Sequence, residues 1–227
     1  MSVPVDDIRK AAREWRYSPV HLLIALGLLL FSSPFVEDLS FGRVLEGLLF
    51  TSVILSGLFA VSARRSMVLG ILLATVAVAA QWLSFFWPAF TSVSLVAAAV
   101  FIGVVIVRLL LHVLNAGEVD HETLCAGVAG FLMIGLLWMV VYTLVAYTDP
   151  KAFLFSVPGQ TMDGFEAFYY SFVTLSTIGF GDITPVSRLA RMLSVMEAVT
   201  GMFYVAVLVA RLVSMYSSAP KKSGPVP

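Results

Sequence analysis

Charge is scarce in this chain of 227 residues. Asp, Glu, Lys and Arg together make up 12% of it, against roughly 25% in soluble domains. Hydrophobic residues make up 59%, and the mean hydropathy is +0.96. An ordinary soluble domain is thereby excluded. Lys and Arg form no basic patch, so no nucleic-acid partner is expected.

Several kinds of reactive site are also missing. The single cysteine, Cys125, excludes a disulfide within the chain. His21, His112 and His121 have no second ligand at metal-binding spacing. There is no Ser-His-Asp set and no glycine-rich phosphate loop. We therefore expect neither an enzyme nor an organic cofactor, and the N-terminal residues show no cleavable signal peptide.

The apolar residues gather in six stretches, each close to the roughly 20 residues that cross a bilayer as a helix. They lie near 19–36, 44–62, 67–86, 89–111, 124–147 and 189–214. The sequence thus predicts an all-α membrane protein with six transmembrane helices. With both termini cytoplasmic, only Arg43, Lys151, Arg188 and Arg191 of the 14 Lys and Arg residues fall outside, as the positive-inside rule favours. We expect a multi-pass protein of the plasma (inner) membrane.

The segment between the last two stretches is only partly apolar. Its apolar run from Phe165 to Leu175 is too short to span a bilayer. Asp163 is expected to cap this run as a helix, with Glu166 completing a capping box. The loop "TLSTIGFGD" follows, and irregular backbone at membrane depth survives only inside protein or beside water. The pattern predicts a re-entrant pore helix followed by a pore loop.

The loop has the chemistry of a cation site. Carbonyls of Thr177, Ile178, Gly179 and Phe180 that face one axis would replace the water shell of a cation. Glycine permits the dihedral angles that aim successive carbonyls the same way. The negative end of the preceding helix favours a cation below the loop, and Asp182 adds negative charge at the outer mouth.

The stretch from Thr177 to Asp182 resembles the selectivity filter of potassium channels, usually Thr-Val-Gly-Tyr-Gly-Asp. The resemblance covers residues 124–216, and residues 191–216 are especially similar to bacterial members. It implies a bacterial six-transmembrane-helix potassium channel of the tetrameric pore-loop family. The implied assembly is a homotetramer that conducts K⁺ passively. K⁺ would bind at Thr177, Ile178, Gly179, Phe180 and Gly181.

Some positions depart from the usual filter pattern. Phe180 replaces Tyr and has no hydroxyl, and Tyr169 and Tyr170 stand where Trp is frequent. Val173 stands where some bacterial channels place a Glu that pairs with the filter Asp, so Asp182 is expected to lack that partner. With Ser176, these residues are the expected filter support. A weakly selective cation channel and a potassium transporter subunit remain alternatives, the latter usually needing four such loops in one chain.

The last apolar stretch holds the gating candidates. Glu197 is an ionisable residue deep in that stretch, which is a functional hypothesis by default. We expect it near the base of the pore helix, bonded around Ser176 or Thr174 or facing the ion cavity. A neutral, hydrogen-bonded structural acid is the alternative. Gly201 matches the inner-helix hinge glycine or serves close packing, and Ala210 and Ser214 lie where the inner helices would cross.

The predicted organisation has four parts. Residues 1–18 form a cytoplasmic amphipathic N-terminus, 19–115 a four-helix peripheral domain, 116–216 the pore domain and 217–227 a disordered tail. The peripheral domain resembles a voltage sensor in helix count and position, but its fourth helix carries Arg108 alone. Conventional voltage gating is therefore not expected. Membrane lipids are expected partners, and no cytoplasmic ligand-binding domain is expected in this chain.

Overall fold

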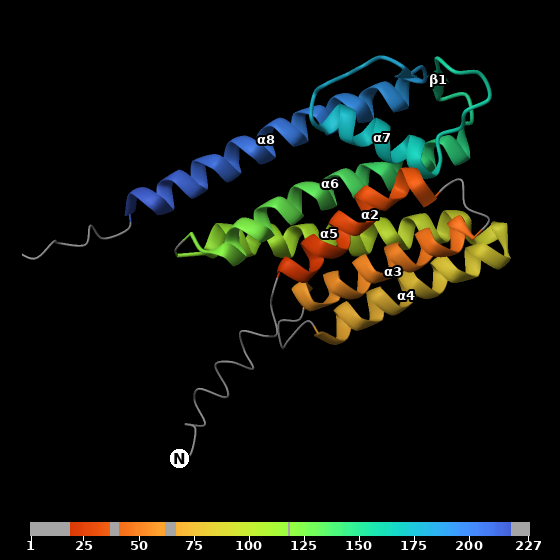
Figure 1. Cartoon of the computed structure of the whole chain (residues 1–227). Coiled ribbons are helices and arrows are strands. Elements are labelled where there is room, and N and C mark those ends of the chain that lie inside the picture. The colour runs from red at the N-terminus through yellow and green to blue at the C-terminus, as the bar shows by residue number, and fades with distance from the viewer. Residues whose placement is uncertain (1–18, 37–40, 62–66, 118, 219–227) are drawn as a thin grey trace, which may run out of the picture.

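The computed structural model of the chain describes residues 19–36, 41–61, 67–117 and 119–218. The predicted N-terminal segment 1–18 and residues 219–227 of the predicted tail lie outside the described residues, whereas the first two residues of that tail, 217–218, belong to the last helix. Helices make up most of the described chain, and each predicted apolar stretch falls on one of them (Figure 1). The elements are α2 (Pro19–Val36), α3 (Gly42–Val61), α4 (Met67–Phe86), η1 (Pro88–Phe90), α5 (Thr91–Asn115), α6 (His121–Thr148), β1 (Phe153–Phe155), α7 (Gly164–Leu175), β2 (Ile183–Pro185) and α8 (Arg188–Ser218).

Within the described residues, four segments are long and apolar enough to cross a membrane. They are Val68–Phe86, Pro88–Asn115, His121–Thr148 and Arg188–Met215. The apolar part of α2, Pro19–Ser32, is shorter. The prediction of several spanning helices is therefore confirmed, and the count of six is not.

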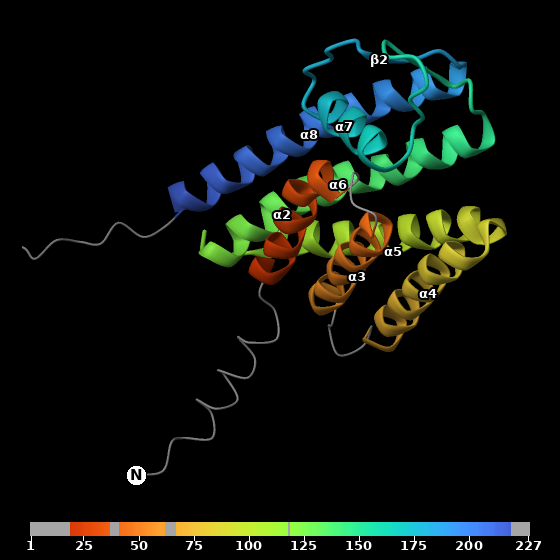
Figure 2. The same cartoon turned by 45° about the vertical axis from the view of Figure 1, so that its right-hand side comes forward.

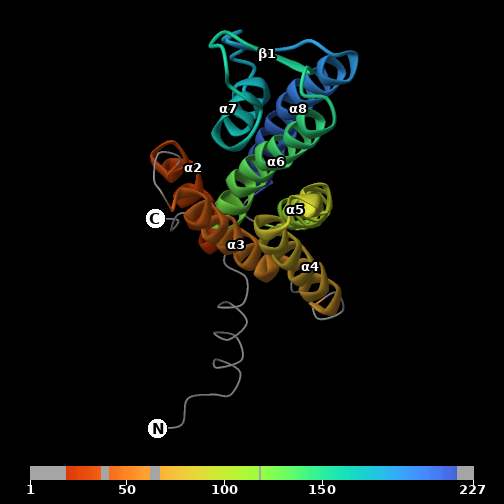
Figure 3. The ribbon, with the colours of Figure 1, turned by 90° about the vertical axis from the view of Figure 1, so that its right-hand side faces the viewer.

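Helix α6 lies at the centre of the structure. Helices α2 to α5 lie on one side of it, where both α2 and α5 pack against it, and α7 and α8 lie on the other (Figure 3). One core of buried side chains runs from α2 to α6, with Leu26, Ile54, Phe101 and Met133 among its members. Because this core is continuous, the four peripheral helices hold α6 as a fixed wall for the site.

A short link fixes α5 beside α6. Asp120 is the N-cap of α6, and its side chain accepts a hydrogen bond of 2.8 Å from the backbone N–H of Thr123. Hydrogen bonding with the Thr123 side chain, and next with its backbone N–H, lowers the pKa of the Asp120 carboxyl. Because only residues 116–120 separate the two helices, α5 and α6 must run antiparallel as neighbours.

A second core holds the end of the molecule where α7 lies. Strands β1 and β2 pair antiparallel there, with Phe153 opposite Pro185. The rings of Tyr142, Phe153 and Tyr170 pack edge to face below them, at centroid distances from 4.9 to 5.7 Å. This pairing joins the chain before α7 to the chain after the loop. Figure 2 shows α7 and its loop at this end of the molecule, where α7 packs against both α6 and α8.

Candidate functional site

Helix α7 begins where predicted, but its first turn is bonded differently. Asp163 occupies the N-cap position, yet its side chain makes no capping hydrogen bond. It accepts instead from the Thr161 hydroxyl, while Glu166 accepts from the Gln160 amide. The predicted capping box is therefore wrong, because both carboxylates find donors in the preceding turn. The helix ends at Leu175, directly before the loop 176–182.

The loop backbone alternates in handedness. Thr177, Gly179 and Gly181 have positive φ angles of 58°, 61° and 80°. Thr177 is the only residue other than glycine with positive φ in the described chain. A β-branched residue is strained there, at about 1–3 kcal/mol. Such strain persists only where the surroundings impose it, and it clusters at functional sites.

Hydrogen bonds to α7 fix the direction of the loop carbonyls. The Val173 carbonyl accepts from the N–H groups of Ile178 at 2.9 Å and of Gly179 at 3.4 Å. In a trans peptide the N–H and the preceding C=O point in opposite directions. The carbonyls of Thr177 and Ile178 therefore both point away from α7. An extended strand would alternate them, so the positive φ angles create a row of acceptors on one side.

The outer end of the loop is tied to α7 by Tyr169. Its hydroxyl donates to Asp182 at 2.7 Å, and its ring stacks on Phe180 with planes only 4° apart. The hydrogen bond to Asp182 raises the pKa of Tyr169 to about 12, so the phenol stays a donor near neutral pH. Asp182 thus has a partner on the pore helix although Val173 offers no carboxyl. The carboxylate partner is absent as expected, and Tyr169 supplies a hydrogen bond to Asp182 in its place.

The other expected support residues lie in separate contacts. The Tyr170 hydroxyl is 2.6 Å from the Ser194 hydroxyl of α8, so it supports the junction of α7 with α8. Val173 acts through its backbone carbonyl. The Ser176 hydroxyl donates to the Phe172 carbonyl and caps the end of α7.

Glu197 of α8 lies at a fully buried junction of three helices. The Tyr142 hydroxyl of α6 donates to its Oε2 atom, and the Ser171 hydroxyl of α7 lies 2.6 Å from its Oε1 atom. The expected contact near Ser176 or Thr174 is therefore wrong, since the carboxyl meets α7 one turn earlier. A buried carboxyl needs partners, and both come from neighbouring helices.

Counting hydrogens at this junction favours a neutral carboxyl. The Ser171 hydroxyl also lies 2.8 Å from the Gly135 carbonyl, which can only accept. A hydroxyl has one hydrogen, so it cannot donate to both neighbours. If Glu197 carries a proton, it donates to Ser171 and Ser171 donates to Gly135, which satisfies every atom. The geometry therefore fits the alternative stated from the sequence, in which Glu197 is a neutral, hydrogen-bonded structural acid.

Gly201 lies where α8 crosses the end of α7. A Cβ atom at this position would lie 2.3 Å from the Leu175 carbonyl oxygen. Helix α8 continues through Gly201 from Arg188 to Ser218 without a break. The close-packing role of Gly201 is therefore visible here, while its hinge role stays a prediction. Ala210 and Ser214 lie further along α8, on its exposed surface.

Sequence reasoning missed three members of the junction behind the loop: Tyr142, Ser171 and Ser194. A signal for Tyr142 existed, because it lies inside an apolar stretch that has no charged residue. A hydroxyl buried in such a stretch needs a hydrogen-bond partner, and Glu197, the acid in another apolar stretch, could supply one. Ser171 and Ser194 lie within one or two helical turns of residues named from the sequence. A serine by itself, however, does not indicate a buried hydrogen bond.

Comparison with known proteins places the site in context. Residues 130–218 match the model of a protein family described as ion channel. The chain is also similar to two-pore potassium channel 4 of Arabidopsis thaliana, with 31% identity over 84 residues. That similarity covers 37% of this chain and 30% of the plant protein, so the match spans less than a third of the relative. No solved structure matches the chain.

The matched segment contains residues 130–148 of α6, together with α7, the loop and α8. It is similar to ion-channel pore domains and only distantly to a potassium channel. The matched family consists of ion channels, not enzymes, in agreement with the expectation from the sequence. The chain is a multi-pass membrane protein with several candidate spans.

Proposed function

We propose that this protein is a potassium-selective channel that conducts K⁺ passively through a homotetrameric pore in a plasma (inner) membrane. The observation that carries the proposal is the row of carbonyls on the open side of the loop. Both N–H groups that follow Thr177 and Ile178 are bonded to Val173, so these carbonyls face away from their own chain. Carbonyl rings are the known means of replacing the hydration shell of K⁺.

One chain supplies only one side of such a ring. Ile178 is 56% exposed and Phe180 is 68% exposed, so the loop lies at the surface of the single chain. At membrane depth, exposed backbone carbonyls are tolerated only where they line a polar or water-filled path. Four copies around an axis would close the ring, with Thr177, Ile178, Gly179, Phe180 and Gly181 as ion ligands. The complete pore would then also contain the faces of α8 that bear Ala210 and Ser214.

The match to the ion channel family supports conduction, and the relative's printed name supports K⁺ as the ion. The weakly selective cation channel is favoured by one observation, the absence of a hydroxyl on Phe180. Against it stands the Tyr169 bond to Asp182, which ties the same part of the loop to α7. We therefore prefer selectivity. The transporter subunit has no separate observation in its favour.

The peripheral helices α2 to α5 are proposed to act as a scaffold and not as a conventional voltage sensor. Arg108 is the only Lys or Arg in α5, and a steep voltage response needs several such charges. The cytoplasmic position of both termini is part of the same proposal.

The test is ion flux through liposomes that contain the purified protein. We expect K⁺ flux that Ba²⁺ blocks, little Na⁺ flux, and loss of K⁺ flux in Gly179→Ala. Gly179 has φ of 61°, and no atom lies within 4 Å of the place that a Cβ would occupy, so alanine strains the backbone without a clash. Gly103→Ala on α5 is the matched control, since Gly103 has equal space and no positive φ. Equal K⁺ and Na⁺ flux would favour the nonselective channel.

A further inference from the structure

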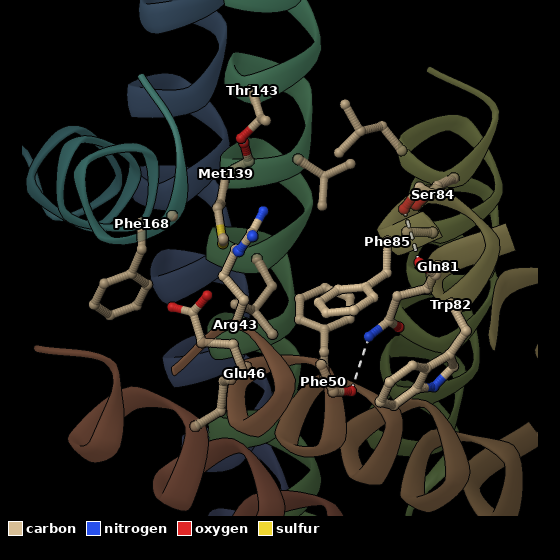
Figure 4. A pocket seen from close by; sticks show the side chains of 18 residues that line it. Arg43, Glu46, Phe50, Gln81, Trp82, Ser84, Phe85, Met139, Thr143 and Phe168 are labelled. Carbon is tan, nitrogen blue, oxygen red and sulfur yellow. Dashed lines mark hydrogen bonds between the residues drawn. The ribbon is translucent and has the colours of Figure 1, made fainter. Parts of the chain in front are cut away.

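A cavity of about 360 Å³ lies between the peripheral helices and the helices of the candidate pore. Helices α3 and α4 form one side of it, and α6 with the start of α7 forms the other (Figure 4). The cavity lies within one chain, so it does not depend on any assembly. Its volume is in the usual range for small-molecule and cofactor pockets.

One end of the cavity is polar and carries both signs of charge. Arg43 and Glu46 are three residues apart on α3, and Figure 4 shows both side chains between α3 and α6. The Arg43 guanidinium lies over the ring of Phe85, 5.7 Å from its centre. The end therefore offers a cation and an anion side by side to an occupant.

Two hydroxyl oxygens in the lining add further acceptors to the cavity. Thr143 donates its hydrogen to the Met139 carbonyl at 2.9 Å, and Ser84 donates to the Gln81 carbonyl at 2.7 Å. Because each hydroxyl has one hydrogen, both oxygens offer only lone pairs to an occupant. An occupant with N–H donors is thereby favoured. Gln81 and Ser94 add further polar atoms, and the buried Gln81 Oε1 atom has no hydrogen-bond partner within the described residues. Most of the remaining lining is apolar or aromatic, including Phe50, Leu136 and Phe168.

We propose that this cavity binds a zwitterionic glycerophospholipid whose headgroup carries a primary ammonium. The phosphate would lie on Arg43, and the ammonium would donate to Glu46 and to the hydroxyl oxygens. The acyl chains would cover the aromatic wall. A headgroup with only negative charge would be repelled by the Glu46 carboxylate. A quaternary ammonium has no hydrogen to donate to that carboxylate. The charge pattern of the cavity thus selects among phospholipids.

The cavity reaches the pore helix through Phe168. Its ring packs on Phe172, with the ring centres 4.6 Å apart, and the next residue, Tyr169, holds Asp182. A bound lipid would therefore steady α7 and the loop that follows it. This second step rests on the proposed function, whereas lipid binding itself does not.

The binding test is native mass spectrometry of the full chain in detergent, titrated with phosphatidylethanolamine, phosphatidylcholine and phosphatidylglycerol of identical acyl chains. We expect about tenfold preference for the ethanolamine lipid over the choline lipid, as hydrogen bonds to a charged group supply. Glu46→Gln should abolish this preference and strengthen binding of the glycerol lipid. Arg43→Gln should weaken all three, and Arg43→Lys should restore most binding.

Lys151→Gln is the control, because Lys151 is an exposed cation outside the cavity lining. It should leave all three affinities unchanged. Equal binding of the three lipids by the unaltered chain would overturn the proposal, as would an unchanged preference in Glu46→Gln. A circular-dichroism melt of each variant checks that the helices remain folded.

The coupling step is tested by K⁺ flux in liposomes with and without the ethanolamine lipid. We expect higher flux with it, and no such difference in Glu46→Gln. Equal flux in both liposomes would overturn the coupling while leaving the binding result intact. No flux in any liposome would instead count against the proposed function, and the mass measurement would still decide lipid binding.

Discussion

At the scale of single residues, the loop is held by a few side chains with distinct tasks. Thr177 sits at a strained positive φ, and the Val173 carbonyl gathers the two N–H groups that follow it. Tyr169 holds the outer end through Asp182 and Phe180. Each contact runs from α7 to the loop, so α7 dictates the loop conformation.

Replacing Tyr169 with Phe removes the hydroxyl and keeps a ring to stack on Phe180. Hydrogen bonds to a charged group contribute about 1.5–3 kcal/mol, so we expect the loop to be loosened by a comparable amount. The expected result is a lower ratio of K⁺ to Na⁺ flux in liposomes. Tyr147→Phe is the control, since Tyr147 is 52% exposed on α6.

A double-mutant cycle with Asp182→Asn separates this bond from other effects. If the two residues act through their hydrogen bond, the double variant should lose little more than either single variant. Additive losses would contradict the proposed role of Tyr169.

Glu197 makes the second prediction at this scale. If the carboxyl is neutral, Glu197→Gln keeps the shape and polar contacts of the junction and should cost little stability. Glu197→Ala leaves the Tyr142 hydroxyl buried without this partner, at about 1–3 kcal/mol, while the Ser171 hydroxyl keeps its hydrogen bond to the Gly135 carbonyl. Thermal unfolding in detergent measures both variants. Equal losses in Gln and Ala would mean that the charge, not the hydrogen bonding, matters.

At the scale of elements, the positions of the helices can be predicted from the apolar runs, whereas the contacts between the helices cannot. The run from Phe165 to Leu175 predicted α7 closely. The predicted capping box of Asp163 and Glu166 was wrong because Thr161 and Gln160 donate hydrogen bonds to these two carboxylates instead. A local sequence pattern cannot show which donor a carboxylate will accept from.

The pairing of β1 with β2 was not predicted from the sequence. Each strand has only three residues, too few for an alternating pattern to stand out. Their pairing joins segments about thirty residues apart, which the packing of α7 against α6 and α8 brings together. The filter motif was found from sequence, while its support from Tyr142, Ser171 and Ser194 required the fold.

The crossing of α8 over α7 gives the prediction at this scale. Gly201→Ala would place a methyl group against the Leu175 carbonyl, a backbone atom that cannot move alone. We expect α8 to shift, with a loss of about 1–3 kcal/mol in stability and reduced K⁺ flux. Gly103→Ala on α5 is the control, with nothing within 4 Å, and should be tolerated. Normal melting and flux in Gly201→Ala would contradict the crossing.

At the scale of the whole molecule, the single chain leaves much apolar surface uncovered. Met202 is 64% exposed and Phe203 is 68% exposed on α8, which lies within the segment that matches the ion channel family. Lipid covers part of such a surface, and the proposed homotetramer would cover more of it. Ile178 and Phe180 of the loop are exposed as well, so assembly and conduction form a single proposal.

The central claim is that the loop carbonyls select K⁺. The most direct measurement is the reversal potential of currents through the purified protein in a planar bilayer, with K⁺ on one side and Na⁺ on the other. A selective carbonyl ring predicts a reversal potential displaced far in the direction set by K⁺ in the unaltered protein, and loss of the K⁺ current in Gly179→Ala. A reversal potential near zero in the unaltered protein would contradict the claim.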